Sequence, residues 1–110
     1  MRIPVNAWKN GKFDDPRTRY GLHIIVPDDV CLFRRELGTV TVELPDGTVA
    51  YANIDKDSFY DNCPHLIRKE IKEWFRANGY LTWPSRKPHK FELELIDQNK
   101  GVFRLYDNQN

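Results

Sequence analysis

Residues 39–54 read TVTVELPDGTVAYANI, and this stretch decides the fold. Polar and apolar side chains alternate along residues 39–44, which is the pattern of a β-strand that buries one face. A Pro-Asp-Gly turn follows, and residues 48–54 then supply a second run of β-branched and apolar side chains. The stretch therefore predicts a β-hairpin with Val40 and Val42 on one face.

Further strands are expected on both sides of this hairpin. Towards the C-terminus, KFELELI (90–96) alternates in the same way, and VFRLY (102–106) follows after the turn sequence DQNKG. These two runs predict a second hairpin. Towards the N-terminus, YGLHIIV (20–26) is β-branched and apolar and predicts a strand that Pro27 ends.

A short helix is expected just before the first hairpin. Asp28 suits its N-cap, and Asp29 adds a negative charge to the first turn, where the helix dipole favours one. Val30 and Phe33 share a face at helical spacing. Gly38 is expected to end the helix, because glycine readily adopts the left-handed conformation found after a helix.

The main helix is expected to begin at Pro64, a residue that fits the first turn, with Asn62 or Cys63 as the N-cap. The pair Asn78-Gly79 is expected to end it. Its predicted apolar stripe consists of Ile67, Ile71, Trp74 and Asn78, with Phe75 at the edge. The opposite stripe is basic and is typical of a solvated helix face; it consists of Arg68, Lys69, Lys72 and Arg76.

These elements together predict the fold class. Residues 6–19 are polar and rich in turn-forming residues, so we expect an arm or a long loop there. Amphipathic strands in antiparallel pairs predict an α+β fold: a small, mainly antiparallel, partly open β-barrel with one short and one longer helix. Residues 1–110 are expected to form a single domain, with an N-terminal arm at 1–19 and a barrel core at 20–106.

The composition narrows the function classes. The chain has 17 basic and 16 acidic residues, so a net charge of +1 argues against a protein held to DNA or membranes by bulk charge alone. No apolar run approaches the ~20 residues of a membrane-spanning helix, and no signal peptide is predicted. Cys31 and Cys63 do not make a disulfide framework, so a cytoplasmic location is expected.

Four pieces of the chain carry a resemblance to a known family: GLHIIVPDDVCLFRREL, TVTVELPDGTVAYANI, IKEWFRANGYL and FELELIDQNKGVFRLY. In this order, over about residues 20–106, they resemble the DNA-binding pseudobarrel family. That family includes a plant transcription-factor domain and the effector domains of some restriction endonucleases. The first two pieces are also similar to the swapped-hairpin regulators of bacterial antitoxins and transition-state factors. Both resemblances imply DNA binding.

The resemblance also implies where DNA would be contacted. In the pseudobarrel family, two arms enter the major groove. The first would fall within residues 9–23, and the second near residues 50–60, where this chain is acidic. The basic side chains of the first segment, with its one histidine, are Lys9, Lys12, Arg17, Arg19 and His23.

A second basic segment, TWPSRKPHKF, occupies residues 82–91 and is stiffened by two prolines. Arg86 can pair bidentately with a phosphate or a guanine, and Lys87 and Lys90 can neutralise phosphates. Trp83 can stack on an unpaired base. In the alternative interpretation, Trp83 plugs the end of the barrel and the basic side chains are only solvated.

Aromatic and basic residues also interleave in the N-terminal arm. This mixture suits a segment that becomes ordered on nucleic acid. It also suits an arm that packs on its own domain or is exchanged with a dimer partner. The predicted nucleic-acid-binding residues are Lys9, Lys12, Arg17, Arg19, Trp83, Arg86, Lys87 and Lys90.

Cys63 and His65 are the strongest candidates for catalysis, because a cysteine at a helix N-terminus can have a lowered pKa and a nearby histidine can act as a base. No catalytic signature surrounds them, and the histidines and cysteines lack the spacing of a zinc site. The acidic residues at 55–61 lack the glycine and the final acid of a calcium loop. We therefore assign no catalytic residue and expect neither a metal nor a cofactor.

Three functional hypotheses follow. The first is a nucleic-acid-binding module, with DNA as the expected ligand, that uses the N-terminal arm and the 82–90 loop. The second is a homodimeric interaction or accessory module whose exposed strand edges pair. The third is a small-ligand binder or enzyme with a pocket at the mouth of the barrel. The aromatic residues expected to line that pocket are Trp74, Trp83, Tyr51 and Tyr60.

Overall fold

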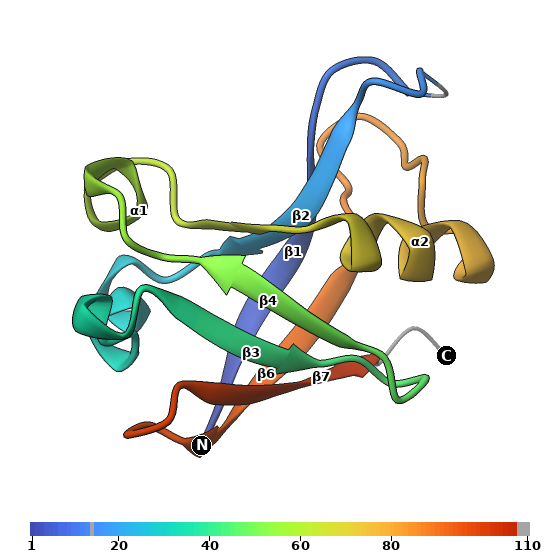
Figure 1. Ribbon diagram of the computed structural model, residues 1–110. Helices are drawn as coiled ribbons and strands as arrows, with labels where there is room; N and C mark the ends of the chain where they lie inside the picture. The colour runs from blue at the N-terminus through green and yellow to red at the C-terminus, as the bar shows by residue number, and fades with distance from the viewer. Residues whose placement is uncertain (14, 108–110) are drawn as a thin grey trace.

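The computed structural model describes residues 1–13 and 15–107 of the chain (Figure 1). The strands are β1 (Arg2–Asn10), β2 (Arg19–Ile24), β3 (Thr39–Glu43), β4 (Val49–Asn53), β5 (His65–Ile67), β6 (Lys90–Asp97) and β7 (Val102–Asp107). The α-helices are α1 (Asp57–Asp61) and α2 (Lys69–Asn78), and the 3-10 segments are η1 (Pro27–Leu32) and η2 (Arg35–Leu37).

The seven strands form one mixed sheet in the order β4-β3-β7-β6-β1-β2-β5. Neighbouring strands are antiparallel except for β3 and β7, which are parallel. The sheet curls without closing, and α2 packs against β2 and β4 at the open side (Figure 1). The predicted class, an α+β fold with a mainly antiparallel, partly open barrel, is therefore confirmed.

Both predicted hairpins are confirmed. The first pairs β3 with β4 from Thr39 opposite Asn53 to Glu43 opposite Val49. The second pairs β6 with β7 and contains one irregularity between Leu95 and Asp97. Alternate residues of these strands enter the core, as the period of two predicts. The buried members are Val40, Val42, Ala50, Ala52, Phe91, Leu93, Phe103 and Leu105.

The prediction for residues 6–19 is wrong in its first half. Residues 2–10 form β1, which lies inside the sheet and pairs with β6 on one side and β2 on the other. Ile3, Val5 and Ala7 alternate with outward-facing residues and are buried. The strand was missed because its inward side chains are few and small, and because its two neighbours come from distant parts of the sequence.

The main helix begins later than predicted. Residues 65–67 form β5, which pairs with β2, and α2 starts at Lys69 rather than near Pro64. The extended conformation satisfies the open edge of β2 and buries Leu66 completely, so tertiary pairing overrides the helical signal of Pro64. The predicted end is confirmed, because Gly79 caps α2 in the left-handed conformation.

The segment predicted as one short helix consists of the two 3-10 segments η1 and η2. Phe33 lies between them and stacks on Phe103 in the core, with 4.5 Å between ring centroids. Gly38 ends η2 at a φ of 76°, as expected. Among the described residues, no helix is both long enough and apolar enough to cross a bilayer.

Gly21 is required for the close approach of β5 to β2. A Cβ built on Gly21 would lie 2.4 Å from the backbone oxygen of Leu66, and backbone can move away only if β5 is displaced. We predict that Gly21→Ala lowers the free energy of unfolding by about 1–3 kcal/mol, the usual effect of overpacking. Urea unfolding followed by circular dichroism measures this change.

The matched control is Tyr51→Thr on β4, because Tyr51 is exposed and threonine retains a high strand propensity. Its effect should stay within about 0.5 kcal/mol. If Gly21→Ala is no more destabilising than this control, β5 does not depend on the glycine.

Candidate nucleic-acid interface

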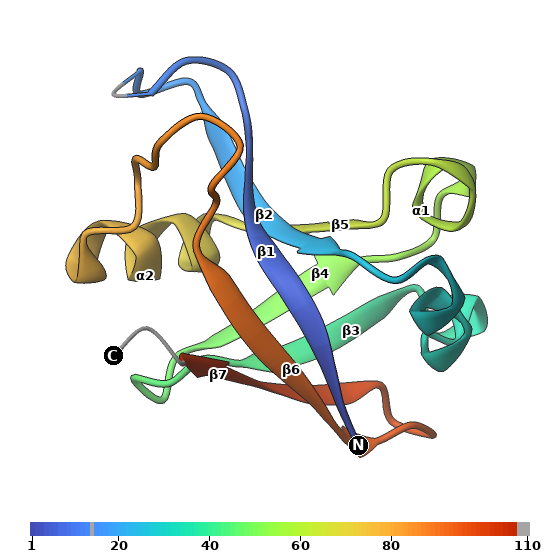
Figure 2. The same cartoon turned by 180° about the vertical axis from the view of Figure 1, so that it is seen from behind.

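Two basic segments lie side by side at one end of the barrel (Figures 1 and 2). They are residues 9–19, around the β1–β2 connection, and residues 82–90, between α2 and β6; together we call them the loop end. Phe13 meets Trp83 edge to face, with 5.2 Å between ring centroids, and Tyr20 meets Trp83 at 6.2 Å. Aromatic contact therefore joins the two segments, which the sequence could not show.

The 82–90 segment is held in place by its own hydrogen bonds. The His89 ring nitrogen Nε2 lies 2.9 Å from the backbone oxygen of Thr82, and the Lys87 N–H donates to the Pro84 oxygen at 3.0 Å. Ala7 N–H donates to the His89 oxygen at 2.8 Å and anchors the segment to β1. The loop is thus tied at its base and closed by a turn at its tip.

The other segment is anchored by the helix. Lys72 on α2 donates from Nζ to the backbone oxygens of Pro16 (3.0 Å) and Thr18 (2.9 Å). Thr18 is buried, and its hydroxyl donates to the Lys12 oxygen at 2.5 Å. Lys72, predicted to be a solvated helix residue, therefore fixes the β1–β2 connection.

Positive charge dominates the loop end, with seven basic residues against two acidic ones in the sequence. Arg17 is engaged by Asp15 at 3.2 Å, and its hydrogen bonds to Asp15 lower the pKa of that carboxyl. Lys9 donates to the backbone oxygen of Gly11 and lies over the Phe13 ring, so it supports the segment locally.

The remaining predicted cations are exposed at the surface; they are Lys12, Arg19, Arg86, Lys87 and Lys90. Within residues 1–13 and 15–107, the side chains of Lys12, Arg19, Arg86 and Lys87 have no ion pair or hydrogen bond. Trp83 is half-buried and contacts Phe13, Tyr20 and His89. Part of its ring therefore anchors the loops, as the alternative interpretation expected, and the rest lines a hollow described below.

A basic groove next to the loop end was missed by sequence reasoning. A hollow of about 280 Å³ separates the start of α2 from the end of the β1–β2 connection. The basic residues that line it are Arg17, Arg19, Arg68, Lys69 and Lys72. Arg68 pairs with Glu70 at 3.2 Å. The helical charge stripe was visible in the sequence, but only the packing of α2 on β2 places it opposite the arginines of the connection.

A second hollow, of about 300 Å³, was also missed; we call it the slot. Its lining includes Asn6, Trp8, Lys9, His23, Trp83 and Pro88. The indole of Trp8 crosses β2 at Gly21, which has no side chain, and stacks on His65 with 4.1 Å between ring centroids. The slot could not be found from the sequence while residues 6–10 were assigned to a loop.

The polar groups under the slot are neutral and incompletely paired. Burial lowers the pKa of His23, and burial together with nearby His23 and Lys56 lowers the pKa of His65 to about 4. Both rings are therefore uncharged near pH 7. Asn6 Oδ1 and His23 Nδ1 are buried and have no hydrogen-bond partner in the described part of the chain.

The catalytic candidate loses its structural basis. Cys63 precedes β5 and is exposed, so it does not lie at a helix N-terminus as predicted. The imidazole of His65 is stacked on Trp8 rather than paired with an acid. Among the described residues, no three His, Cys, Asp or Glu side chains gather closely enough to hold a metal.

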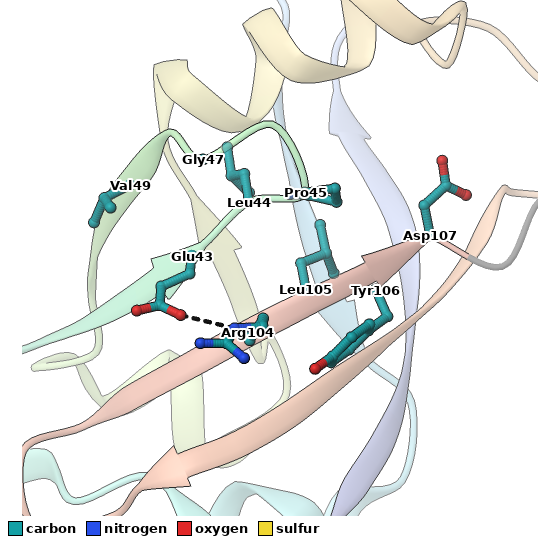
Figure 3. Close-up of a pocket in the computed structure, with 9 residues that line it drawn as sticks. All are labelled: Glu43, Leu44, Pro45, Gly47, Val49, Arg104, Leu105, Tyr106 and Asp107. Atoms are coloured by element: carbon teal, nitrogen blue, oxygen red, sulfur yellow. Dashed lines mark hydrogen bonds and ion pairs between the residues drawn. The ribbon is translucent and has the colours of Figure 1, made fainter.

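The largest hollow, about 520 Å³, lies between the β3–β4 turn and the end of β7 (Figure 3). Its charged groups are already paired: Arg104 with Glu43 at 2.9 Å, and Asp107 with the Tyr80 hydroxyl at 2.7 Å. Burial and Asp107 raise the pKa of Tyr80 to about 12. We therefore assign no binding role to this hollow.

The pocket predicted at the mouth of the barrel does not form. Trp74 is buried in the core, and Tyr51 is exposed on β4. Trp83 lines the slot, whereas Tyr60 lines a different hollow beside η1 and α1. The four aromatic residues therefore do not converge.

Comparison of the chain with protein-family models, curated proteins and solved structures gives no match. The assignment of an interface to the loop end rests on the charge, exposure and packing of its residues. Two of the residues described above, Arg86 and His65, allow this geometry to be tested without a ligand.

Arg86 has a φ of 63° at the tip of the 82–90 segment, the only positive value among the described non-glycine residues. A non-glycine residue in this left-handed conformation is strained by about 1–2 kcal/mol. We predict that Arg86→Gly raises the free energy of unfolding by about 0.5–1 kcal/mol, after allowing for the extra freedom of glycine in the unfolded chain. Ser85→Gly, which relieves no such strain, is the control and should not be stabilising.

His65 makes stability depend on acidification. In the unfolded chain its imidazole takes a proton near pH 6.5, whereas in the fold its pKa is about 4. The unfolded state therefore binds more protons between these values, and stability is lost as the pH falls from about 6.5 to 4. We predict that His65→Phe, which keeps an aromatic ring against Trp8, reduces this loss in urea unfolding at pH 7 and 4.5. Equal losses in both proteins would contradict the prediction.

Proposed function

We propose that this protein is a nucleic-acid-binding module of the DNA-binding pseudobarrel type and that its interface is the loop end. The observation that carries the proposal is the placement of residues 9–19 against residues 82–90, joined by the contact of Phe13 with Trp83. Two basic segments far apart in the sequence thereby share one surface. A chain with a net charge of only +1 can then present a local positive patch.

The exposed cations support contact with phosphates. Arg19, Arg86 and Lys87 have side chains that no acidic group within the described residues neutralises. Arginine can bind a phosphate through two parallel hydrogen bonds, and each phosphate contact releases a condensed counterion. Binding through the loop end should therefore weaken as the salt concentration rises.

The basic groove extends this surface along α2. Lys69 adds an exposed cation across the groove from Arg19, and Lys72 holds the connection that carries Arg19. A nucleic-acid backbone that contacts both Arg86 and Arg19 can therefore continue towards the start of α2. This continuity favours an extended polyanion over a small anionic ligand.

The acidic segment near residues 50–60 has no part in the proposed interface. Arg35 pairs with Asp55 at 3.1 Å and with Asp57 at 2.8 Å, so the protein itself engages these carboxylates. The segment leads into α1, which lies apart from the loop end (Figures 1 and 2). We therefore propose a single contact surface rather than the two arms that the family resemblance implied.

The test is fluorescence anisotropy of labelled single-stranded and duplex DNA at about 50 and 200 mM salt. We predict that the double variant Arg86→Ala/Lys87→Ala binds about tenfold or more weakly at the lower salt concentration. Because each lost phosphate contact removes about one unit, the slope of log K against log salt should fall by about two.

The matched control is Arg34→Ala/Lys100→Ala, which removes two charges near the β6–β7 turn, away from the loop end (Figure 1). Its binding should stay close to that of the unmodified protein. No binding of either DNA at the lower salt concentration, or equal losses in the two double variants, would overturn the proposal. Sedimentation of the free protein then tests the homodimer alternative.

A further inference from the structure

The slot exists because two neighbouring strands separate. The ladder between β1 and β6 ends at Asn6 opposite Lys90, and one further hydrogen bond joins Ala7 to His89. Beyond this point β1 continues to Asn10, while the chain that precedes β6 turns away from it (Figure 2). A notch therefore opens beside β1, between two rigid pieces of the fold.

Flat apolar groups form the walls of the notch. Trp8 lies on one side, supported from behind by His65, with 25° between the planes of the two rings. Trp83 and Pro88 belong to the opposite segment, where Phe13 and His89 hold the Trp83 ring edge to face. Walls of this kind suit a flat aromatic ligand, because they offer stacking surface that is already ordered.

The floor carries polar groups that can read the edge of such a ligand. Asn6 and His23 lie opposite each other on β1 and β2, and both line the slot. Asn6 Oδ1 and His23 Nδ1 lack partners among the described residues, although buried polar atoms are normally hydrogen-bonded. A turn of the Asn6 amide would present its acceptor to a ligand N–H group.

Positive charge lies at the rim of the slot rather than on its floor. Lys90 is directly opposite Asn6 in the β1–β6 pairing and is exposed. Lys87 precedes Pro88, which belongs to the wall. The floor histidines are neutral near pH 7, since burial lowers their pKa values. A ligand with a neutral flat body and a charged backbone therefore fits this arrangement.

We propose that the slot holds an unpaired nucleobase between Trp8 and Trp83, and that the nucleic acid recognised is single-stranded. This inference rests on the proposed function of the loop end, which supplies the phosphate contacts. In a duplex the bases are stacked and paired inside the helix, so they cannot enter the slot without unpairing. An aromatic slot beside a basic surface is the combination that single-strand binders use.

The test compares one sequence as a labelled single strand and as a duplex, by fluorescence anisotropy at low salt. The unmodified protein should bind the single strand about tenfold more tightly, since one stacked base contributes about that much. Trp8→Leu should lose about this factor on the single strand and change duplex binding little. The control is Tyr51→Leu, which removes an exposed aromatic ring on β4 and should change neither.

Circular dichroism confirms that Trp8→Leu is folded. If it is not, Asn6→Leu replaces it with the same expectation, because Asn6 lies on the floor of the slot. The comparison of strand and duplex in the unmodified protein needs neither variant.

The outcomes separate the two proposals. If the unmodified protein binds strand and duplex equally, or if Trp8→Leu binds the strand as well as the unmodified protein does, the slot holds no base. Weakened binding of both DNAs by Arg86→Ala/Lys87→Ala would in that case leave the proposed function standing. If neither DNA binds, both proposals are wrong.

Discussion

The pairing of β1 with both β2 and β6 is the constraint on which the rest of the structure depends. It places a strand from the first ten residues inside the sheet, where Val5 is completely buried. Because β1 and β2 are antiparallel and adjacent, their connection projects from one end of the barrel. Because β6 enters the sheet opposite Asn6, the segment before it projects from the same end. The loop end follows directly from this strand order.

Once the two segments emerge together, side-chain contacts fix their geometry. Trp83 bridges them through Phe13 and Tyr20, and Lys72 fastens the β1–β2 connection to α2. The strained backbone of Arg86 is tolerated at the tip, where its side chain is exposed. A surface ordered in this way before any ligand arrives loses less conformational entropy on binding. The same order keeps the two tryptophans of the slot apart and facing the solvent-filled notch.

The near-zero net charge conceals a separation of charge that the fold creates. Acidic residues beside α1 are engaged by Arg35, whereas several cations of the loop end lack acidic partners among the described residues. Each ion pair at the surface contributes little to stability. Their effect is on recognition, since they leave positive potential concentrated at one end of the molecule.

The sequence by itself determined the local elements. Alternation predicted the two hairpins, glycines marked the ends of η2 and α2, and the spacing of Ile71, Trp74 and Phe75 predicted the buried face of α2. All eight predicted contact residues fall within the two segments that meet at the loop end. Only the tertiary structure decided that residues 2–10 form a strand, that α2 starts after β5, and that a groove and a slot adjoin the loops. The physical reason is that hairpins and helix caps depend on neighbouring residues, whereas β1, β5 and both hollows depend on partners distant in the chain.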